Sequence, residues 1–444
     1  MNFQDKYIGI IGLGKSGYWS AKLAKSLDYN VFISDVNIEP NHPYVQDLEQ
    51  LNVEVEVGKH SDKILDCDVI IKSPGISNKI NLFKKISNHN IPVISEIEFA
   101  SLLSNVDNIC VTGTNGKTTT VSLIFDIISS ELNILKSGNI GIPFSRVVLE
   151  NELYKKNKYD YCVLELSSFQ LEHSYYLKKE ISAILNISVD HMDRYDSFTQ
   201  YLDTKMKIFE NSNFCIYNFD DKQIKERFLS HNQNSFAFSL NKSHGNFYLD
   251  NNKIRSKNSN YSLDIHRCKL KGVHNISNFL AAATIAKKVN ISEKNIFKAI
   301  KNFEGLTHRF EHFLTKDGID FINDSKSTNI DSAIMALKSI DSNVILIMGG
   351  IPKEEDFSSI LQFKNNIETI IAYGKAAKSI YDSLSKEINV IVIEGFKEAV
   401  NMSLKCANTG STVLLSPACS SFDQFKNFEE RGISFKNIVE RFYA

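Results

Sequence analysis

Short apolar runs alternate along the chain with segments that repeat apolar residues at helical spacing. Most of the runs end in Gly, Asp or Ser, which is typical of strands that lead into a turn. The runs lie at residues 7–11, 31–34, 69–72, 93–95, 109–112, 161–164, 181–187, 214–217, 321–323, 344–348, 367–373, 390–393 and 413–416. Such alternation predicts an α/β protein with parallel sheets, in which ligands collect at the carboxyl ends of the strands.

Residues 234–272 depart from this alternation of strands and helices. They read as short strands with an alternating apolar–polar pattern, separated by polar turns. Asn251 and Asn252 suit the tight turn of a hairpin, so we expect a small antiparallel flap here. A chain of 444 residues has room for two to four domains. Because no linker or internal repeat marks the boundaries, we place three domains at residues 1–95, 96–305 and 306–444.

The charge balance and the cysteines narrow the class of protein. The 51 lysines and arginines nearly equal the 52 aspartates and glutamates, which gives no support for nucleic-acid binding. No apolar run approaches the roughly 20 residues that span a bilayer, and no signal peptide is evident. The 7 cysteines are widely spaced and include no CxxC pair, which indicates a reducing compartment. We expect a cytoplasmic protein without membrane insertion.

The strongest chemical signal is the segment VTGTNGKTTT at residues 111–120, between a predicted strand and a predicted helix. Gly113 and Gly116 would let backbone N–H groups surround phosphate oxygens, and Lys117 would reach the outer phosphates. The Thr118 hydroxyl would ligate Mg²⁺. The structural alternative is a tight turn rich in Gly and Thr. The preceding strand, the glycines, the lysine and the following helix all favour a phosphate loop instead.

Gly12, Gly14 and Gly17 form a GxGxxG pattern after the first strand, and Asp35 lies 18 residues beyond Gly17. This pattern has three readings. It could bind NAD with Asp35 on a ribose, serve as a tight turn needed for packing, or cradle another nucleotide diphosphate. The separate phosphate loop favours the third reading.

Three further side chains are candidates for chemistry in the middle of the chain. Glu165 ends a predicted strand, where its carboxylate could hold Mg²⁺, although an acidic residue at a strand exit is common. His191 also follows a strand, and a packed loop histidine is its ordinary alternative. Lys205 would ordinarily be a surface lysine, and composition alone gives no reason to choose it over Lys207.

Taken together, these segments resemble the motifs of the Mur ligases of peptidoglycan synthesis, in family order and over essentially the whole chain. They are SPGI at 73–76, TGTNGKTT at 112–119, GNIG at 138–141, LELSSFQLE at 164–172, DHMDRY at 190–195, HN at 274–275, HRFE at 308–311, NDSKSTN at 323–329 and SPACSSFDQFKNFEERG at 416–432. The resemblance implies a Rossmann-like N-terminal domain, a central P-loop ATPase domain with a parallel sheet and flap, and a Rossmann-like C-terminal domain.

The resemblance also implies an ATP-dependent ligase, acting as a monomer, that joins D-glutamate to UDP-N-acetylmuramoyl-L-alanine through an acyl phosphate. It assigns ATP to Gly113, Thr114, Asn115, Gly116, Lys117, Thr118, Thr119, Asn275, Asn278, Arg309 and Asp324. It assigns the UDP-linked substrate to Gly14, Lys15, Ser16, Asp35, Ser73, Gly75, Asn139, Gln170 and His191. It assigns D-glutamate to Lys326, Thr328, Lys353, Ser421 and Phe428.

By the same resemblance, the catalytic residues are Lys117, Glu165, His191 and Lys205. Thr118 and Glu165 would hold one Mg²⁺, and His191 with a carbamylated Lys205 would hold a second. A lysine ammonium cannot ligate Mg²⁺, whereas its CO₂ adduct presents carboxylate oxygens.

Each assignment made from the resemblance has a structural alternative. Arg309 could pair with Glu311 on the surface, and Asp324 or Ser421 could cap a helix. The rival functions are a ligase for another substrate, including another Mur step or folylpolyglutamate synthesis, an NAD-dependent dehydrogenase, and a nucleotide-switch protein.

Overall fold

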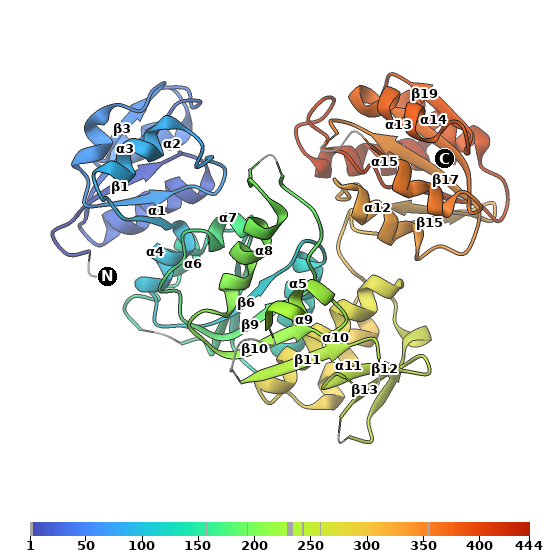
Figure 1. Ribbon diagram of the computed structural model, residues 1–444, viewed down its shortest axis with the longest axis horizontal. Coiled ribbons are helices and arrows are strands. Elements are labelled where there is room, and N and C mark those ends of the chain that lie inside the picture. The colour runs from blue at the N-terminus through green and yellow to red at the C-terminus, as the bar shows by residue number, and fades with distance from the viewer. Residues whose placement is uncertain are drawn as a thin grey trace. The chain divides into compact units, whose positions relative to one another are not determined.

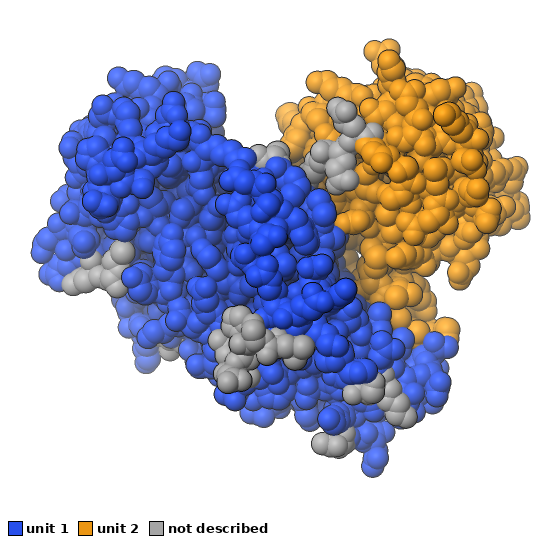
Figure 2. Space-filling view, viewed as in Figure 1, with its two compact units in different colours: residues 1–264, 277–300 blue, residues 265–276, 301–444 orange. Residues whose placement is uncertain are grey.

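Three α/β domains, each built on its own sheet, follow one another along the chain in this computed structural model (Figure 1). The structure describes residues 3–139, 141–156, 158–192, 194–228, 234–241, 244–257, 259–352 and 356–444. Contacts divide the chain into two compact units, residues 1–264 with 277–300 and residues 265–276 with 301–444 (Figure 2). The N-terminal and central sheets belong to the first unit, and the C-terminal sheet belongs to the second.

The N-terminal sheet has the strand order β3-β2-β1-β4-β5, and all its strands are parallel. Its strands are β1 (Tyr7–Ile11), β2 (Asn30–Asp35), β3 (Glu54–Val57), β4 (Val69–Lys72) and β5 (Val93–Ser95). Its helices are α1 (Lys15–Ser26), α2 (Pro43–Gln50) and α3 (Asn81–Asn88). The order of connection reverses between β1 and β4, so the loops that follow these two strands meet at a topological switch point.

The central sheet has the order β14-β13-β12-β11-β10-β9-β6-β8-β7. Its strands are β6 (Asp107–Thr112), β7 (Ile134–Gly138), β8 (Tyr161–Glu165), β9 (Lys179–Ile184), β10 (Ser212–Asn218), β11 (Ser235–Ser239), β12 (Phe247–Asp250), β13 (Lys253–Ser256) and β14 (Ser262–Asp264). Its helices are α4 (Glu96–Leu102), α5 (Lys117–Ile128), α6 (Phe144–Glu150), α7 (Ser168–Leu171), α8 (Phe198–Met206), α9 (Lys222–Phe228), α10 (Val273–Lys288) and α11 (Glu293–Asn302).

The last strands of the central sheet confirm the predicted flap. β12, β13 and β14 pair antiparallel, and the turn between β12 and β13 is formed by Asn251 and Asn252. Their φ angles of 46° and 59° lie in the left-handed region, which asparagine tolerates and which a two-residue hairpin turn requires. One part differs from the expectation, because β11 runs parallel to β10 and to β12.

The C-terminal sheet has the order β15-β16-β20-β17-β18-β19 and is parallel except for β15. Its strands are β15 (Glu311–Lys316), β16 (Ile319–Asn323), β17 (Val344–Gly349), β18 (Ile367–Tyr373), β19 (Val390–Ile393) and β20 (Thr412–Leu415). Its helices are α12 (Ile330–Leu337), α13 (Ala377–Leu384), α14 (Phe396–Cys406) and α15 (Phe428–Phe442).

The central strand β17 explains why unbroken apolar runs predicted buried strands. Val344, Leu346 and Met348 belong to the hydrophobic core on one face of the sheet. Ile345 and Ile347 point the other way, into a second core that α14 and α15 help to form. Both faces are therefore covered, and no polar residue is needed on either side. Within the described part of the chain, no helix is both long enough and apolar enough to cross a membrane.

A buried carboxyl group marks the connection between the first two domains. Glu96 begins α4, is almost fully buried, and accepts a hydrogen bond from the Ser145 backbone N–H at 2.6 Å. Its second oxygen, Oε2, has no hydrogen-bond partner. Burial raises the pKa of Glu96 from 4.5 to about 7. The Glu96 carboxyl group therefore ionises at a lower pH in the unfolded chain than in the folded protein. As a result, the folded protein loses stability as the pH rises from about 5 to 7.

We expect Glu96→Gln to melt at a higher temperature than the wild type at pH 8, and this gain should shrink towards pH 5. The glutamine keeps the carbonyl acceptor and removes a charge whose burial costs up to roughly 3 kcal/mol for such a pKa shift. Thermal melts at the two pH values measure the effect. Glu49→Gln, at an exposed position of α2, is the control. A gain that is the same at both pH values would contradict the explanation.

Candidate active site

The phosphate loop predicted at residues 113–116 lies between β6 and α5. Gly116 has a φ of +80°, and a Cβ there would lie 2.4 Å from Oδ1 of Asn278. Both facts require glycine at this position. Lys117 opens α5, and its Nζ donates hydrogen bonds to the backbone oxygens of Gly113 at 2.9 Å and Thr114 at 2.8 Å. The loop thus combines a helix N-terminus with a lysine, which is the arrangement that binds phosphate.

Asn186 supports this loop, and sequence reasoning gave it no role. It follows β9, the neighbour of β6 in the sheet. Its Oδ1 accepts from the Asn115 backbone N–H at 2.8 Å, and its Nδ2 donates to the Asn115 carbonyl at 3.0 Å. The Thr114 N–H donates to the Asn186 carbonyl at 2.9 Å. The only signal in the sequence was a polar residue directly after a buried strand.

Glu165 ends β8 beside the phosphate loop, as predicted. Gly138, the last residue of β7, pairs with it, and a Cβ on Gly138 would lie 2.2 Å from the Glu165 carbonyl oxygen. This close approach brings in Asn139, whose Nδ2 donates to Glu165 Oε1 at 3.1 Å. The other carboxylate oxygen, Oε2, is buried and has no hydrogen-bond partner. A buried, unsatisfied carboxylate oxygen suits a hard cation such as Mg²⁺.

Lys205 is buried, whereas Lys207 is not, so the structure separates two lysines that composition could not. Lys205 lies on α8, and its Nζ donates to the Gly113 carbonyl of the phosphate loop at 2.8 Å. Burial, followed by the nearby charge of Lys117, holds the pKa of Lys205 well below its usual value. Nζ of Lys207 instead donates to the Glu172 carbonyl at 3.3 Å. An amine that readily loses its proton therefore faces the phosphate loop.

His191 follows β9 and has a φ of +60°, which is unusual for a residue other than glycine. Its backbone N–H donates to Asp190 Oδ1 at 2.9 Å, and its Nε2 lies 3.5 Å from Asp190 Oδ2. The Phe169 ring contacts the imidazole edge to face, with centroids 4.8 Å apart. The described residues contain no cluster of three or more His, Cys, Asp or Glu that could hold a metal.

Gln170 has a structural task that the sequence did not reveal. Its Oε1 accepts from the Ser167 backbone N–H at 2.9 Å and from the Ser167 hydroxyl at 3.0 Å, which completes a capping box at the start of α7. Gln170 is also buried. Its predicted contact with the UDP-linked substrate stays a prediction, and the capping box explains why glutamine suits this position independently of a ligand.

The glycines of the N-terminal GxGxxG segment have different physical reasons. Gly12 has a φ of +94°, and a Cβ on Gly17 would lie 2.0 Å from the Gly12 carbonyl oxygen. Gly14 is the N-cap of α1, and nothing lies within 4 Å of the Cβ it lacks. Two glycines therefore shape the turn, while Gly14 leaves open space in front of the helix N-terminus. Open space there is what a phosphate requires.

Asp35 braces this loop from the end of β2. One carboxylate oxygen accepts from the Leu13 backbone N–H at 2.6 Å. The other accepts from the N–H groups of Asn37 at 2.7 Å and Ile38 at 3.1 Å. Both oxygens thus bind backbone groups, so Asp35 positions the loop whether or not it also contacts a base. Its predicted contact with the UDP-linked substrate stays a prediction.

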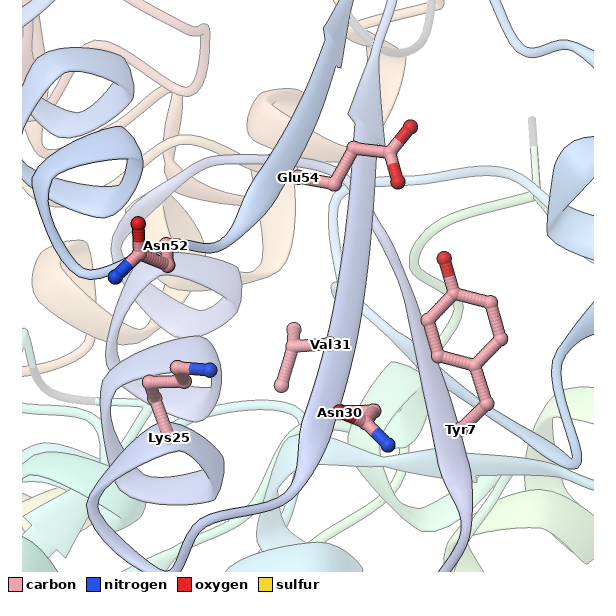
Figure 3. Close-up of a pocket in the computed structure, with 6 residues that line it drawn as sticks. All are labelled: Tyr7, Lys25, Asn30, Val31, Asn52 and Glu54. Carbon is pink, nitrogen blue, oxygen red and sulfur yellow. The ribbon is translucent and has the colours of Figure 1, made fainter.

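A shallow depression in the N-terminal domain lies at the amino ends of the strands, opposite the end of the sheet that carries this loop (Figure 3). Its lining residues are Tyr7, Lys25, Asn30, Val31, Asn52 and Glu54. Tyr7, Asn30 and Glu54 are the first residues of β1, β2 and β3, respectively. Ligands of parallel sheets bind beyond the carboxyl ends of the strands, so we assign no role to this depression.

In the second unit, the segment after β16 gathers several predicted residues. Asp324 accepts from the Phe310 backbone N–H at 3.0 Å and from the Ser416 hydroxyl at 3.1 Å, and burial raises its pKa to about 7. Nζ of Lys326 lies 3.9 Å from the centre of the Phe428 ring. The Phe428 carbonyl accepts from the Ser325 hydroxyl at 2.8 Å. The structure therefore brings Lys326 and Phe428 together, as expected for residues that share a substrate.

Arg431 is the central support of this cluster, and sequence reasoning gave it no role. It is fully buried, and its hydrogen bonds go to neutral oxygens. It donates to the Ser325 carbonyl at 2.7 Å, the Cys419 carbonyl at 3.1 Å, the Gly349 carbonyl at 3.4 Å and the Tyr373 hydroxyl at 3.2 Å. These partners end or follow four neighbouring strands of the C-terminal sheet. One guanidinium thus fixes the carboxyl edge of this sheet.

The structural alternatives for Asp324 and Ser421 do not hold. The N-caps of α12 and α15 are Asn329 and Asn427, so neither Asp324 nor Ser421 caps a helix. The carboxylate of Glu311 forms an ion pair with Lys436 at 2.6 Å, and a pairing of Arg309 with Glu311 stays a prediction.

The remaining predicted residues are placed only in part. Lys353 lies outside the described residues. Asn275 belongs to the second unit, where its Nδ2 donates to the Lys271 carbonyl at 2.7 Å, and Asn278 belongs to the first. The ligand contacts predicted for all these residues stay predictions.

Comparison with known protein families matches all three domains. Residues 7–82 match the MurD N-terminal domain, residues 111–286 the Mur ligase middle domain, and residues 308–419 the glutamate ligase domain of Mur ligases. The UDP-N-acetylmuramoylalanine–D-glutamate ligase of Bacteroides thetaiotaomicron is 37% identical over 449 residues, covering 98% of this chain and 99% of the relative. The same ligase of Elusimicrobium minutum is 37% identical over 458 residues, covering 99% and 98%.

Solved structures show the same fold at low identity. A MurF ligase from Thermotoga maritima in complex with ADP has a TM-score of 0.64 at 14% identity, covering 93% of this chain and 95% of that one. A pseudomurein peptide ligase type C from Methanothermus fervidus has a TM-score of 0.61 at 18% identity, covering 99% and 100%. Three domain matches in order, and relatives that match over nearly their whole length, establish that this chain belongs to the Mur ligase family.

Proposed function

We propose that this chain is an ATP-dependent ligase that joins the amine of D-glutamate to the carboxylate of UDP-N-acetylmuramoyl-L-alanine through an acyl phosphate. The observation that carries the proposal is the cluster at the carboxyl edge of the central sheet. There the phosphate loop, a carboxylate oxygen without a hydrogen-bond partner on Glu165 and the buried amine of Lys205 come together. Relatives that match nearly the whole chain carry the name of this reaction.

The first step transfers the γ-phosphoryl group of ATP to the alanine carboxylate, with release of ADP. Lys117 and the N-terminus of α5 hold the phosphates and offset repulsion between two anions. Thr118 and the Glu165 oxygen that has no hydrogen-bond partner would hold Mg²⁺, which would supply further positive charge at the phosphates. The amine of D-glutamate then attacks the acyl carbon, and inorganic phosphate leaves with one oxygen of the former carboxylate.

Lys205 acts as a carbamate in this proposal. Its neutral amine adds to CO₂, forming an N–C bond and releasing one proton. The low pKa that burial gives this amine supports the reaction, because only the unprotonated form is a nucleophile. The oxygens of the carbamate, together with His191, would hold a second Mg²⁺.

The UDP-linked substrate binds at the N-terminal sheet, and D-glutamate binds at the C-terminal sheet. The UDP end takes the loop at residues 12–17, where Gly14 leaves the N-terminus of α1 open, together with Lys15, Ser16, Ser73 and Gly75. Asn139 and Gln170 serve the muramoyl part. D-glutamate takes Lys326, Thr328, Lys353, Ser421 and the backbone of Phe428, and two lysines suit a dicarboxylate.

One chain holds every group assigned here, so a monomer suffices. All 7 cysteines are free thiols, which supports the cytoplasm, where ATP is also available.

The test is phosphate release from ATP and UDP-N-acetylmuramoyl-L-alanine in the presence of single amino acids. D-glutamate is expected to trigger stoichiometric release of ADP and phosphate, whereas L-glutamate, L-alanine and diaminopimelate are not. Release with a different amino acid would assign the chain to another step. A change in nicotinamide absorbance without ADP would favour the dehydrogenase reading of the loop at residues 12–17.

A further inference from the structure

Arg194 links the central domain to a turn of the N-terminal domain within the first unit. Its guanidinium donates to three consecutive carbonyls, those of Pro74 at 3.3 Å, Gly75 at 3.2 Å and Ile76 at 2.8 Å. A planar group with several fixed N–H donors can serve three acceptors at once, which a lysine ammonium cannot do in this geometry. Arg194 therefore fixes the shape of the turn as well as its place.

This turn at residues 73–76 contacts the loop at residues 12–17 directly. The Ser73 hydroxyl donates to the Gly12 carbonyl at 2.8 Å, and a Cβ on Gly12 would lie 2.9 Å from Cβ of Ser73. The Ile76 N–H closes the turn on the Ser73 carbonyl at 3.1 Å. With so little space between them, the turn must respond to any shift of the loop when a ligand binds.

The other side of Arg194 contacts the surroundings of His191. The guanidinium carbon lies 4.5 Å from the centre of the Phe169 ring, and the same ring contacts the His191 imidazole at 4.8 Å. The Arg194 backbone N–H donates to the His191 carbonyl at 2.9 Å. His191 keeps a φ of +60°, a conformation that persists only where neighbours hold it. Arg194 and Phe169 are two of these neighbours.

We propose that Arg194 is a positioning residue that couples occupation of the loop at residues 12–17 by the UDP-linked substrate to the placement of His191 at the central site. The inference rests on the proposed function and names a contact through which one substrate site influences the other. Binding of the UDP end sets the turn at residues 73–76, the turn sets the guanidinium, and the guanidinium with Phe169 sets His191. Arg194 itself touches none of the reacting atoms.

Other contacts hold the two domains together, so removal of Arg194 is not expected to separate them. Nζ of Lys72, a buried side chain at the end of β4, lies 3.7 Å from the half-buried carboxylate of Glu172. Arg146 of α6 lies over the Trp19 ring of α1 at 4.8 Å. Arg146 thus resembles Arg194, since it too stacks on an aromatic ring where these domains meet. It contacts neither the turn nor His191, and this makes Arg146→Ala a matched control.

The experiment compares wild type, Arg194→Ala, Arg194→Lys, His191→Ala, the double variant Arg194→Ala/His191→Ala, and Arg146→Ala. Steady-state assays with D-glutamate give kcat and a separate KM for each substrate. Calorimetric titration with UDP-N-acetylmuramoyl-L-alanine gives its Kd without turnover, and thermal melts check folding. Wild-type activity with D-glutamate is measured first. Its absence would refute the proposed function on its own, before any variant is compared.

We expect Arg194→Ala to raise KM for the UDP-linked substrate and to lower kcat at saturation by about tenfold to a hundredfold, as misplacement of a catalytic group does. Arg194→Lys should show most of this loss, and Arg146→Ala should resemble wild type. In the His191→Ala background, loss of Arg194 should lower kcat no more than about threefold further, because coupled residues are not additive. Full additivity, an effect on KM alone, or a loss of kcat fully explained by unfolding would each overturn the proposal.

Discussion

Lys117→Ala is expected to lower kcat by at least about a hundredfold, the loss typical of removing one preorganised charge at a transition state. Nζ of Lys117 lies within hydrogen-bond distance of the Gly113 and Thr114 carbonyls, so its charge is held at the loop that would receive the γ-phosphate. Binding of UDP-N-acetylmuramoyl-L-alanine should persist, because its UDP end uses the N-terminal sheet. Steady-state kinetics and calorimetry on the same preparation measure both quantities.

Two variants sharpen the Lys117 test. Lys117→Arg keeps the charge but changes its reach, and it should recover only part of the rate. Lys136→Ala removes a lysine from strand β7. Nζ of Lys136 lies 5.0 Å from the centre of the Phe125 ring, and this variant should retain activity. Near-normal phosphate release by Lys117→Ala would show that the loop at residues 113–116 does not hold the transferred phosphate.

Lys205→Ala is expected to be nearly inactive, and short-chain carboxylic acids should restore part of its activity. The reason is the buried position of the amine, 2.8 Å from the Gly113 carbonyl, with a pKa held well below that of an ordinary lysine. A small carboxylate can occupy the space of the missing carbamate and offer the same oxygens to Mg²⁺. Assays of Lys205→Ala with and without acetate or formate measure the rescue.

Lys207→Ala is the matched control for Lys205, two residues away and bound to the Glu172 carbonyl instead of the phosphate loop. It should stay active, with a stability change of no more than roughly 0.5 kcal/mol. Wild-type activity should also fall when dissolved CO₂ is removed and recover when bicarbonate is added. Full activity of Lys205→Ala, or a lack of rescue together with indifference to CO₂, would remove the carbamate from the account.

The sequence predicted interior strands well and some edge strands not at all. β3, β7 and β15 each lie at an edge of a sheet, and none was predicted. Their sequences EVEV, ILKSG and EHFLTK carry charged side chains, which an edge exposes to water. The edge strands β5 and β19 were predicted, because VIS and VIVI read as apolar runs. Apolar content, which reports burial, is therefore a weak signal for a strand with one exposed side.

In the candidate site, features formed by neighbouring residues could be predicted from the sequence, and contacts between residues far apart in the sequence could not. The phosphate loop could be predicted because its glycines, lysine and helix are neighbours in sequence. The support from Asn186 could not, since its partner Asn115 is 71 residues away. Arg431 likewise binds a carbonyl 106 residues away. The choice of Lys205 over Lys207 needed the burial of each side chain, and composition does not contain that information.

The most direct test of the central claim, that ATP activates a carboxylate as an acyl phosphate, follows an isotope. UDP-N-acetylmuramoyl-L-alanine labelled with ¹⁸O in both oxygens of its alanine carboxylate is converted with ATP and D-glutamate, and the products are analysed by mass spectrometry. Phosphorylation of the carboxylate predicts one ¹⁸O in the released phosphate, one in the amide product, and none in ADP. Unlabelled phosphate, or label recovered in AMP, would contradict the account.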